Sequence, residues 1–377
     1  MSSRQLEVEI IVDPADARAL WKKLGTDAVT GAAQSAEWFA SWQSLVNRDC
    51  LVAALYAGQQ PVLLLPLEVE KKGPVQLAVF AGGPHANCNF PARSRGQTFT
   101  RRDLISLFDA LHKARPDIDL VSLTRQLREL GGTANPLMQL SSRENANVSL
   151  GVTLDAAFET VLARNNAKRK KKKHRHTTRR FMDAGGYRIV TATTAAETRA
   201  MLDNYFECKA TRLAKAGIRN TYDPAGIRDF FLQLFTDEAI APAPRFQLKA
   251  LEVAGQYRAV MGKSYAGQQT FIDFIGITED DLVSASPGEF LFFEDIEASC
   301  RTDLAVYSFG IGDEPYKRSW CDIEVATYDT DISLTAKGRA FEAYLRARRA
   351  LVRTIKQNDV IWAKVKMLRS TLRGTRN

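Results

Sequence analysis

Two segments in the last third of the chain decide the fold: SASPGEFLFFEDIEASC (284–300) and YSFGIGDEPYKRSW (307–320). The first follows a predicted strand, TFIDFIGI (270–277), and predicts a helix that begins at Pro287, because proline is favoured at the first helical position. The first amide groups of such a helix have no acceptor inside it, and the helix dipole makes this end positive, so the site favours phosphate. An ordinary capped helix is the alternative interpretation. Neither a Walker lysine nor a G-x-G-x-x-G motif accompanies it, so no nucleotide P-loop or dinucleotide fold is supported.

The second segment places two glycines after a strand and then turns sharply through Asp313-Glu314-Pro315 into a short predicted helix. This helix presents Tyr316 and Lys317. A tyrosine hydroxyl there could donate a proton to a leaving group, and a lysine could hold an anion. A purely structural tyrosine is the alternative.

Outward from these segments, the order of predicted elements repeats. The first half, from LEVEIIV (6–12) to a strand at 148–154, reads strand, helix, helix, three strands, helix, strand, helix, strand. The second half, from a strand at 187–191 to one at 323–328, reads in the same order without evident sequence identity. This pattern predicts an α/β (α+β) fold with a mixed sheet, built from two tandem halves.

The same pattern predicts four parts of the chain. They are an N-terminal half (1–155), a basic connecting helix (156–184), a C-terminal half (185–330) and a C-terminal basic amphipathic helix (331–377) that runs from Thr335 to about Leu372.

The connecting segment is intensely basic, with Lys or Arg at ten of the seventeen positions from Arg164 to Arg180. Because these charges surround the predicted helix, we expect no buried face, and we expect His174 and His176 to lie in solvent. A solvated connecting helix is one interpretation. The other is an anionic partner at 164–180, which could be a substrate, a tRNA or a membrane surface.

Composition limits the class of protein. The 377 residues carry 52 Lys+Arg against 43 Asp+Glu, a net charge of +9 that favours anionic partners, and 45% hydrophobic residues exclude a disordered chain. The five cysteines are scattered and form no C-x-x-C pair, which argues against a disulfide framework and a structural zinc site, so no metal is expected. The N-terminus lacks the apolar core of a signal peptide, and the longest apolar stretch (51–67) is interrupted. We therefore expect a cytoplasmic protein.

The patterns S-x-G-x-x-L (286–291) and F-G-x-G-D-E-x-Y-K (309–317) resemble the CelD/BcsL family of acetyltransferases. The stretches 37–91 and RRFMDAGGYRIV (179–190) are similar to other parts of that family, so the resemblance covers roughly residues 35 to 330. The family belongs to the GNAT (Gcn5-related N-acetyltransferase) superfamily and is related to the FemABX peptidyltransferases.

The resemblance implies a double GNAT-like fold with acetyl-CoA or another acyl-CoA as co-substrate. The acyl-CoA pyrophosphate would be bound by the residues at the start of the helix, which are Ser286, Gly288, Glu289 and Phe290. The strand 271–277, with Ile275, would hydrogen-bond the pantetheine, and Tyr316 would protonate the departing thiolate. An acid is common before the Phe-Gly of the later motif, whereas this chain has Ser308, so Asp273 on the strand becomes the candidate general base. A salt-bridged or capping Asp273 is the alternative.

For the acceptor, His85 and Asn87 in the Gly-rich loop GGPHANCNF are candidate substrate-binding residues in a groove between the halves, and Lys317 is a further candidate substrate-binding residue. A local hydrogen-bonding role for this histidine is the alternative. The predicted function is acyl transfer from acyl-CoA to an amine or hydroxyl of a small molecule or glycan, such as a sugar or cell-envelope polysaccharide precursor. Two other functions remain open: a Fem-like aminoacyl-tRNA-dependent transferase, and a catalytically degenerate GNAT-like binding protein.

Overall fold

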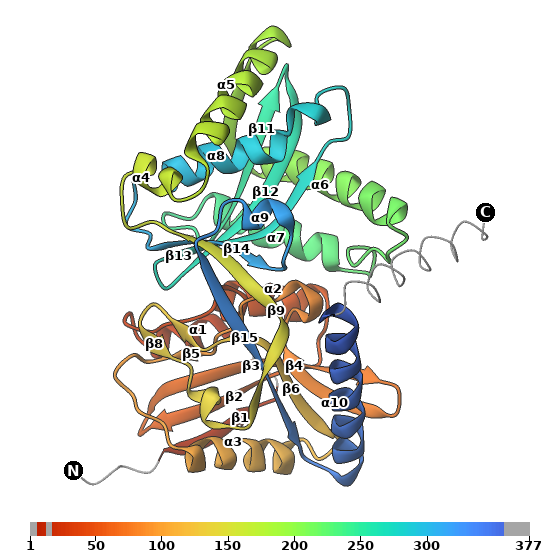
Figure 1. The fold of residues 1–377 in the computed structure, drawn as a ribbon. Coiled ribbons are helices and arrows are strands. Elements are labelled where there is room, and N and C mark those ends of the chain that lie inside the picture. Colours follow the sequence, from red (N-terminus) through yellow and green to blue (C-terminus); the bar gives the residue numbers. More distant parts are fainter. Residues whose placement is uncertain (1–5, 13–16, 358–377) are drawn as a thin grey trace.

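One mixed β-sheet runs through the whole molecule (Figure 1). The structure is a computed structural model that describes residues 6–12 and 17–357. Their main sheet has 13 strands in the order β1-β2-β3-β4-β6-β15-β9-β14-β13-β12-β11-β10, with β5 paired to β3. The predicted mixed α/β fold is confirmed.

The first half follows the predicted order of elements. Its elements are β1 (Glu7–Ile11), α1 (Ala17–Lys23), η1 (Ala32–Gln34), α2 (Ala36–Leu45), β2 (Cys50–Ala57), β3 (Gln60–Lys72), β4 (Val75–Phe80), η2 (Gly83–His85), β5 (Ala92–Arg93), α3 (Arg101–Ala114), β6 (Leu120–Leu127), β7 (Glu129–Leu130), β8 (Thr133–Ala134), η3 (Pro136–Gln139) and β9 (Ser142–Thr153). The helices predicted around α1, α2 and α3 and the three-strand meander β2-β3-β4 are all present.

The second half repeats this order, so the predicted duplication is confirmed. Two helices precede it, α4 (Phe158–Ala163) and α5 (Ala167–Asp183). Its elements are β10 (Tyr187–Thr191), α6 (Ala195–Lys215), α7 (Ile227–Ala239), β11 (Phe246–Val253), β12 (Gln256–Ala266), β13 (Gln269–Ile277), η4 (Val283–Ala285), α8 (Pro287–Ser299), β14 (Val306–Ile311), α9 (Pro315–Arg318) and β15 (Ile323–Ser333). The C-terminal helix α10 (Ala336–Gln357) follows, and its predicted continuation to Leu372 lies outside the described residues.

The two halves exchange their last strands. In each half four antiparallel strands end at a parallel pair, which is β4 with β6 in the first half and β13 with β14 in the second. Strand β9 then pairs with β14, β15 pairs with β6, and β9 and β15 pair with each other. Figure 1 shows these two strands as the diagonal link between the lower, N-terminal half and the upper, C-terminal half. The domain boundaries at 155 and 330 stay a prediction from sequence.

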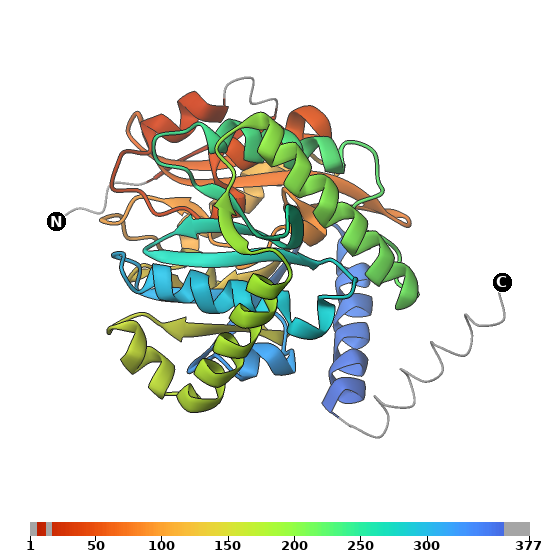
Figure 2. The same ribbon diagram turned by 90° about the horizontal axis from the view of Figure 1, so that it is seen from above.

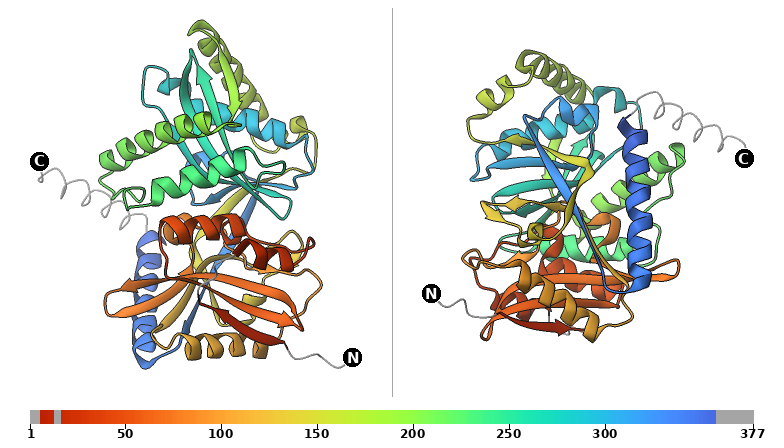
Figure 3. Two further views of the ribbon diagram at one scale, coloured as in Figure 1. Left: turned by 180° about the vertical axis from the view of Figure 1, so that it is seen from behind. Right: turned by 60° about the horizontal axis from the view of Figure 1, so that its bottom comes forward.

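Helices cover both faces of the sheet, because successive apolar side chains of a strand point to opposite faces and both faces must be buried. Leu51, Ala53 and Leu55 of β2 share a core cluster with residues of α3, whereas Val52 and Ala54 belong to the cluster around α2. In the second half, α8 with α4 and α5 lies on one face and α6 with α7 on the other (Figures 2 and 3).

The halves also meet through helices. Trp38 of α2 packs against Phe230 of α7 with ring centroids 4.9 Å apart. Gly226, which precedes α7, has φ +79°, and a Cβ there would lie 1.9 Å from the Leu45 carbonyl oxygen. Only glycine allows this close approach of α7 to the end of α2. None of the described helices combines the length and apolar sequence needed to cross a bilayer.

The connecting segment differs from the prediction in two ways. It forms two helices rather than one, because Asn166 adopts a left-handed conformation (φ 57°) between α4 and α5. The helix α5 also has a buried face, which carries Thr177 and Phe181. His174, expected in solvent, stacks on Phe293 with ring centroids 4.0 Å apart. These residues recur at helical spacing, so one uncharged stripe packs on α8 while the cations lie around it.

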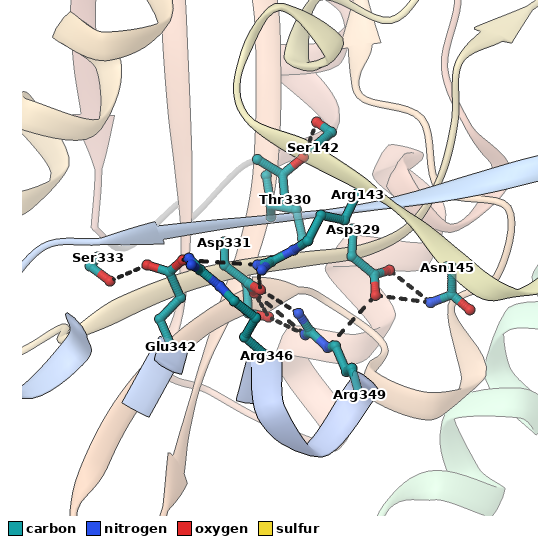
Figure 4. A network of polar contacts seen from close by, with 12 residues as sticks. Ser142, Arg143, Asn145, Asp329, Thr330, Asp331, Ser333, Glu342, Arg346 and Arg349 are labelled. Carbon is teal, nitrogen blue, oxygen red and sulfur yellow. Dashed lines mark hydrogen bonds and ion pairs between the residues drawn. The ribbon is translucent and has the colours of Figure 1, made fainter. Parts of the chain in front are cut away.

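Helix α10 is held against the sheet by buried carboxylates on β15 (Figure 4). The side chain of Asp331 has no exposed surface, and it accepts hydrogen bonds from Ser122 Oγ (2.7 Å) and Arg143 Nη2 (2.9 Å). Arg349 of α10 also donates to Asp331. On the same strand, Asp329 accepts a hydrogen bond of 2.8 Å from Asn145 Nδ2. The last described helix is therefore fixed by charge-assisted hydrogen bonds as well as by apolar contacts.

Replacing Asp331 by alanine is expected to lower the free energy of unfolding by about 2–3 kcal/mol, because two arginines and a buried serine lose their acceptor. The matched control is Glu70→Ala, which removes an exposed acid 3.4 Å from Lys72 and should change stability by less than about 0.5 kcal/mol. Urea unfolding measures both. Equal stability of the two variants would contradict this role of Asp331.

Candidate functional site

The parallel strands β13 and β14 separate soon after they pair. Their register runs only from Gln269 opposite Val306 to Phe271 opposite Ser308. Beyond Ser308, β14 bends at Gly310, whose φ is +67°, and its pairing with β9 shifts register. A cavity of about 310 Å³, here called the catalytic cavity, opens at this point and is lined by both strands.

Asp273 lies in the catalytic cavity at a β-bulge. In the pairing of β12 with β13, Gly262 faces Phe274 and Lys263 faces Ile272, so Asp273 is the extra residue. A bulge redirects a side chain relative to a regular strand. The Asp273 Oδ1 atom accepts a hydrogen bond of 3.0 Å from Ser264 Oγ, whereas Oδ2 is buried and has no hydrogen-bond partner among the described residues.

The electrostatic setting of Asp273 suits a base. Burial raises its pKa to about 7, and the hydrogen bond from Ser264 acts in the opposite direction. At neutral pH the carboxyl group therefore exchanges readily between its charged and neutral forms, and the unpartnered Oδ2 can accept a proton.

Two cations from α6, Lys209 and Arg212, line the catalytic cavity. Burial lowers the pKa of Lys209, and the charge of Arg212 acts in the same direction. Neither side chain makes an ion pair or hydrogen bond with another described residue. Sequence alone does not single out these two residues, because basic residues three positions apart are equally common on solvent-facing helices.

Lys317 lines the same cavity, but its charge is already engaged. Its Nζ atom donates a hydrogen bond of 3.0 Å to the Ile311 carbonyl and lies 2.8 Å from Glu314 Oε2. The lysine thus holds the bend after β14 and neutralises Glu314.

Tyr316 on α9 lines the catalytic cavity and a second cavity of about 510 Å³, here called the helix cavity. Its ring stacks on Phe292 with centroids 5.8 Å apart and an interplanar angle of 9°. Burial raises the pKa of Tyr316 to about 12, with the charge of Glu314 adding to the effect. The hydroxyl is therefore neutral at pH 7 and can donate a proton where the two cavities meet.

The helix cavity lies beside the N-terminus of α8. Pro287 is the first helical residue, and Ser286 has φ 59° and makes no capping hydrogen bond with its side chain. The amide N–H groups of Gly288 and Glu289 donate to no other residue that the structure describes. These groups and the helix dipole favour an anion here.

Gly288 allows the N-terminus of α8 to pack closely against the sheet. A Cβ on Gly288 would lie 2.8 Å from Ile277 Cδ1, so the missing side chain allows α8 to approach β13 closely. Glu289 points toward α5 and forms an ion pair with Lys173.

Most cations around the helix cavity have partners. Lys170 donates from Nζ to the Asn165 carbonyl at 2.6 Å, and Arg318 pairs with Asp313 at 2.6 Å. Arg169 also lines this cavity and makes no ion pair or hydrogen bond with another described residue. It is thus a cation available to an anionic ligand.

The structure brings together most of the residues that the sequence singled out. The catalytic cavity is lined by Asn87, Asp273, Ile275, Tyr316 and Lys317, and the helix cavity by Ser286, Glu289, Phe290 and Tyr316. Asn87 comes from the first half, where its Oδ1 accepts a hydrogen bond of 2.7 Å from Arg125, so the catalytic cavity lies between the halves.

His85 lies apart from these residues and does not line either cavity. Its Nε2 donates to the Thr221 carbonyl at 3.1 Å, and its ring packs against Trp42 and Tyr222. Burial lowers its pKa to about 4, so His85 is neutral at physiological pH. No group of three or more His, Cys, Asp or Glu among the described residues could hold a metal ion.

The second half has a GNAT-type acyltransferase fold. Its defining features are four antiparallel strands, a helix with a free N-terminus and a pair of parallel strands that separate. Residues 168–318 match a family described as an acetyltransferase (GNAT) domain. The matched segment begins in α5 and ends in α9, so it contains β13, α8 and Tyr316. A comparison with curated proteins found no match.

Solved structures share the fold across nearly the whole chain. FemX has a TM-score of 0.55 at 10% identity, and the match covers 86% of this chain and 97% of that one. A conserved protein from Bacteroides thetaiotaomicron has a TM-score of 0.53 at 14% identity, with 86% and 98% covered. L-PGS from Bacillus licheniformis has a TM-score of 0.51 at 12% identity, with 91% and 96% covered. At these identities the likeness establishes the fold, and the narrower CelD/BcsL resemblance stays a prediction.

Proposed function

We propose that this protein transfers an acyl group from acetyl-CoA or another acyl-CoA to an amine or hydroxyl. The observation that carries the proposal is the unpartnered Oδ2 of Asp273, with its raised pKa, in the cavity where β13 and β14 separate. A thioester donor needs such a slot beside a base and a positive helix end to hold its phosphates.

The donor would be held by α8, α5 and β13. The free amides of Gly288 and Glu289 and the unpaired guanidinium of Arg169 would bind the pyrophosphate. Past Phe271, one edge of β13 has no pairing with β14, so its main chain near Ile275 is available to the amides of the pantetheine. The bound thioester supplies the activated acyl group.

The chain's own residues would move two protons. Asp273 Oδ2 takes the proton of the attacking amine or hydroxyl as the new C–N or C–O bond forms. The Tyr316 hydroxyl gives a proton to the thiolate as the C–S bond breaks. The CelD/BcsL resemblance supports a sugar or cell-envelope polysaccharide precursor as the acceptor.

A second candidate is a Fem-like transfer from aminoacyl-tRNA, and one feature of α5 favours it. Lys168, Lys172, Arg175 and Arg179 are exposed, recur at intervals of four, three and four residues, and pair with no described acid. Such a stripe on one helix face suits the phosphates of a nucleic acid.

Acetyl-CoA at about one hundred times its Kd is expected to raise the melting temperature by on the order of 5 °C. Arg169→Gln should weaken acetyl-CoA binding about tenfold, because a charge-assisted hydrogen bond is lost. Arg199→Gln, at an exposed position of α6, is the matched control and should bind acetyl-CoA as the parent chain does. Differential scanning fluorimetry and calorimetry measure both effects. Salt-sensitive binding of aminoacyl-tRNA with no response to acetyl-CoA would favour the Fem-like transferase over the acyl-CoA-dependent one. Binding of acetyl-CoA or aminoacyl-tRNA without any turnover would indicate a catalytically degenerate module.

A further inference from the structure

Lys209 and Arg212 form a pair of cations that make no ion pair with any residue the structure describes. They lie one turn apart on α6 and both line the catalytic cavity. One turn further along the helix, Lys215 forms an ion pair with Glu279. Neither of the two residues that face the cavity has such a partner among the described acids.

Other elements do not fully neutralise this pair. The remaining charged groups that line the cavity are Asp273 on β13, Glu314 before α9 and Lys317 on α9. Glu314 lies 2.8 Å from Lys317, and its charge also acts to raise the pKa of Lys209. Even with Asp273 ionised, the three cations Lys209, Arg212 and Lys317 outnumber the two acids Asp273 and Glu314. The cavity therefore keeps an excess of positive charge.

Keeping two like charges on adjacent turns has a cost. Like charges at this spacing repel each other, and Lys209 is in addition partly buried, which disfavours its charged form. A bound anion removes both costs, because it accepts hydrogen bonds from an ammonium and a guanidinium at once. A phosphate or a carboxylate has the right geometry for this.

We propose that the acceptor is an anion, whose phosphate or carboxylate is bound by Lys209 and Arg212 while its nucleophile faces Asp273. This inference rests on the proposed function, because it names the chemistry of the acceptor in the same reaction. The apolar side chains of Leu213 and Ile218 border the cationic pair, and the cavity of about 310 Å³ admits a small molecule or the end of a larger one. The donor phosphates bind separately, in the helix cavity beyond Tyr316.

The test is calorimetric binding of a neutral, a singly charged and a doubly charged probe: glycerol, glycerate and glycerol 3-phosphate. Glycerol 3-phosphate is expected to bind at least tenfold more tightly than glycerol, with glycerate between them. The double variant Lys209→Gln, Arg212→Gln should weaken glycerol 3-phosphate at least tenfold and leave acetyl-CoA within about twofold. Since Arg212 is exposed, Arg212→Gln alone keeps the test available if the double variant does not fold.

Two controls separate this site from the rest of the surface. Arg169→Gln should weaken acetyl-CoA and leave glycerol 3-phosphate unchanged. The pair Arg101→Gln, Arg102→Gln removes two exposed charges from α3 and should affect neither ligand. Equal binding of glycerol and glycerol 3-phosphate, or glycerol 3-phosphate binding that survives the double variant, would overturn the proposed anion site. If the anion site fails in this way but acetyl-CoA binds, the acyltransferase proposal stands. If glycerol 3-phosphate binds as expected but acetyl-CoA does not, the acyltransferase proposal fails and the anion site stands.

Discussion

Asp273→Asn is expected to slow acyl transfer by about 10²–10⁴-fold, the range for loss of a general base, while acetyl-CoA binds within about twofold of the parent chain. Asparagine has nearly the same shape and can still accept the hydrogen bond from Ser264, so the bulge should persist. The amide oxygen cannot take up the proton that the attacking nucleophile releases. Release of free CoA, followed by thiol titration, measures the rate.

The pH profile distinguishes a base from a merely structural carboxylate. A general base works only when it is deprotonated, so the rate should rise with pH and level off above about 7, the pKa of Asp273. Ser264→Ala removes a hydrogen bond that lowers this pKa, so the rise should move to higher pH. A pH profile that is the same in the parent chain, Asp273→Asn and Ser264→Ala would contradict the role of Asp273 as general base.

Stability gives an independent check on the same pKa. The pKa of Asp273 is raised on folding from an ordinary value of 3.8 to about 7. Its contribution to stability is therefore fully present below about pH 4 and is lost as pH rises toward 7, since the unfolded chain ionises first. Asp273→Asn does not titrate, so its melting temperature relative to the parent chain should rise between pH 4 and pH 8.

The second large effect is expected from Asp295→Ala, with a loss of about 3–5 kcal/mol of unfolding free energy. Asp295 faces the sheet from α8 with no exposed side-chain surface, 2.7 Å from both Lys249 and Lys263. Burial raises the pKa of Asp295, but the charges of the two lysines outweigh it and hold the pKa below its usual range. Removing the acid leaves Lys263, which is 1% exposed, without its counter-ion.

A compensating variant tests this explanation. Asp295→Leu combined with Lys263→Met replaces the buried pair by apolar groups and should recover most of the lost stability. Lys249 is nearer the surface, with 17% of its side chain exposed, so it can reach solvent. Urea unfolding of the single and double variants measures the coupling. No recovery in the double variant would show that Asp295 stabilises the fold by other means.

Much of the fold follows from local patterns. Alternating apolar residues predict the strands, and proline at 287 predicts where α8 begins, because these signals depend on neighbours within one turn or one strand. The repeated order of elements follows from the same signals. The sequence alone therefore predicts the duplication, the start of α8 and an acid at position 273, but it does not predict how these features lie relative to one another.

Long-range contacts decided the rest. The exchange of β9 and β15 joins strands far apart in the sequence. Ser122 on β6 and Asp331 on β15, for example, are separated by 209 positions, and no local pattern encodes such a partner. The bulge at Asp273 exists only relative to β12, and the stacking of His174 on α8 outweighs the solvation expected of a basic helix. Lys209 and Arg212 face a cavity because α6 packs across β13. The spacing of apolar residues along the sequence specifies which face of a helix or strand is apolar. The burial and the pKa of a side chain depend on which distant element covers that face.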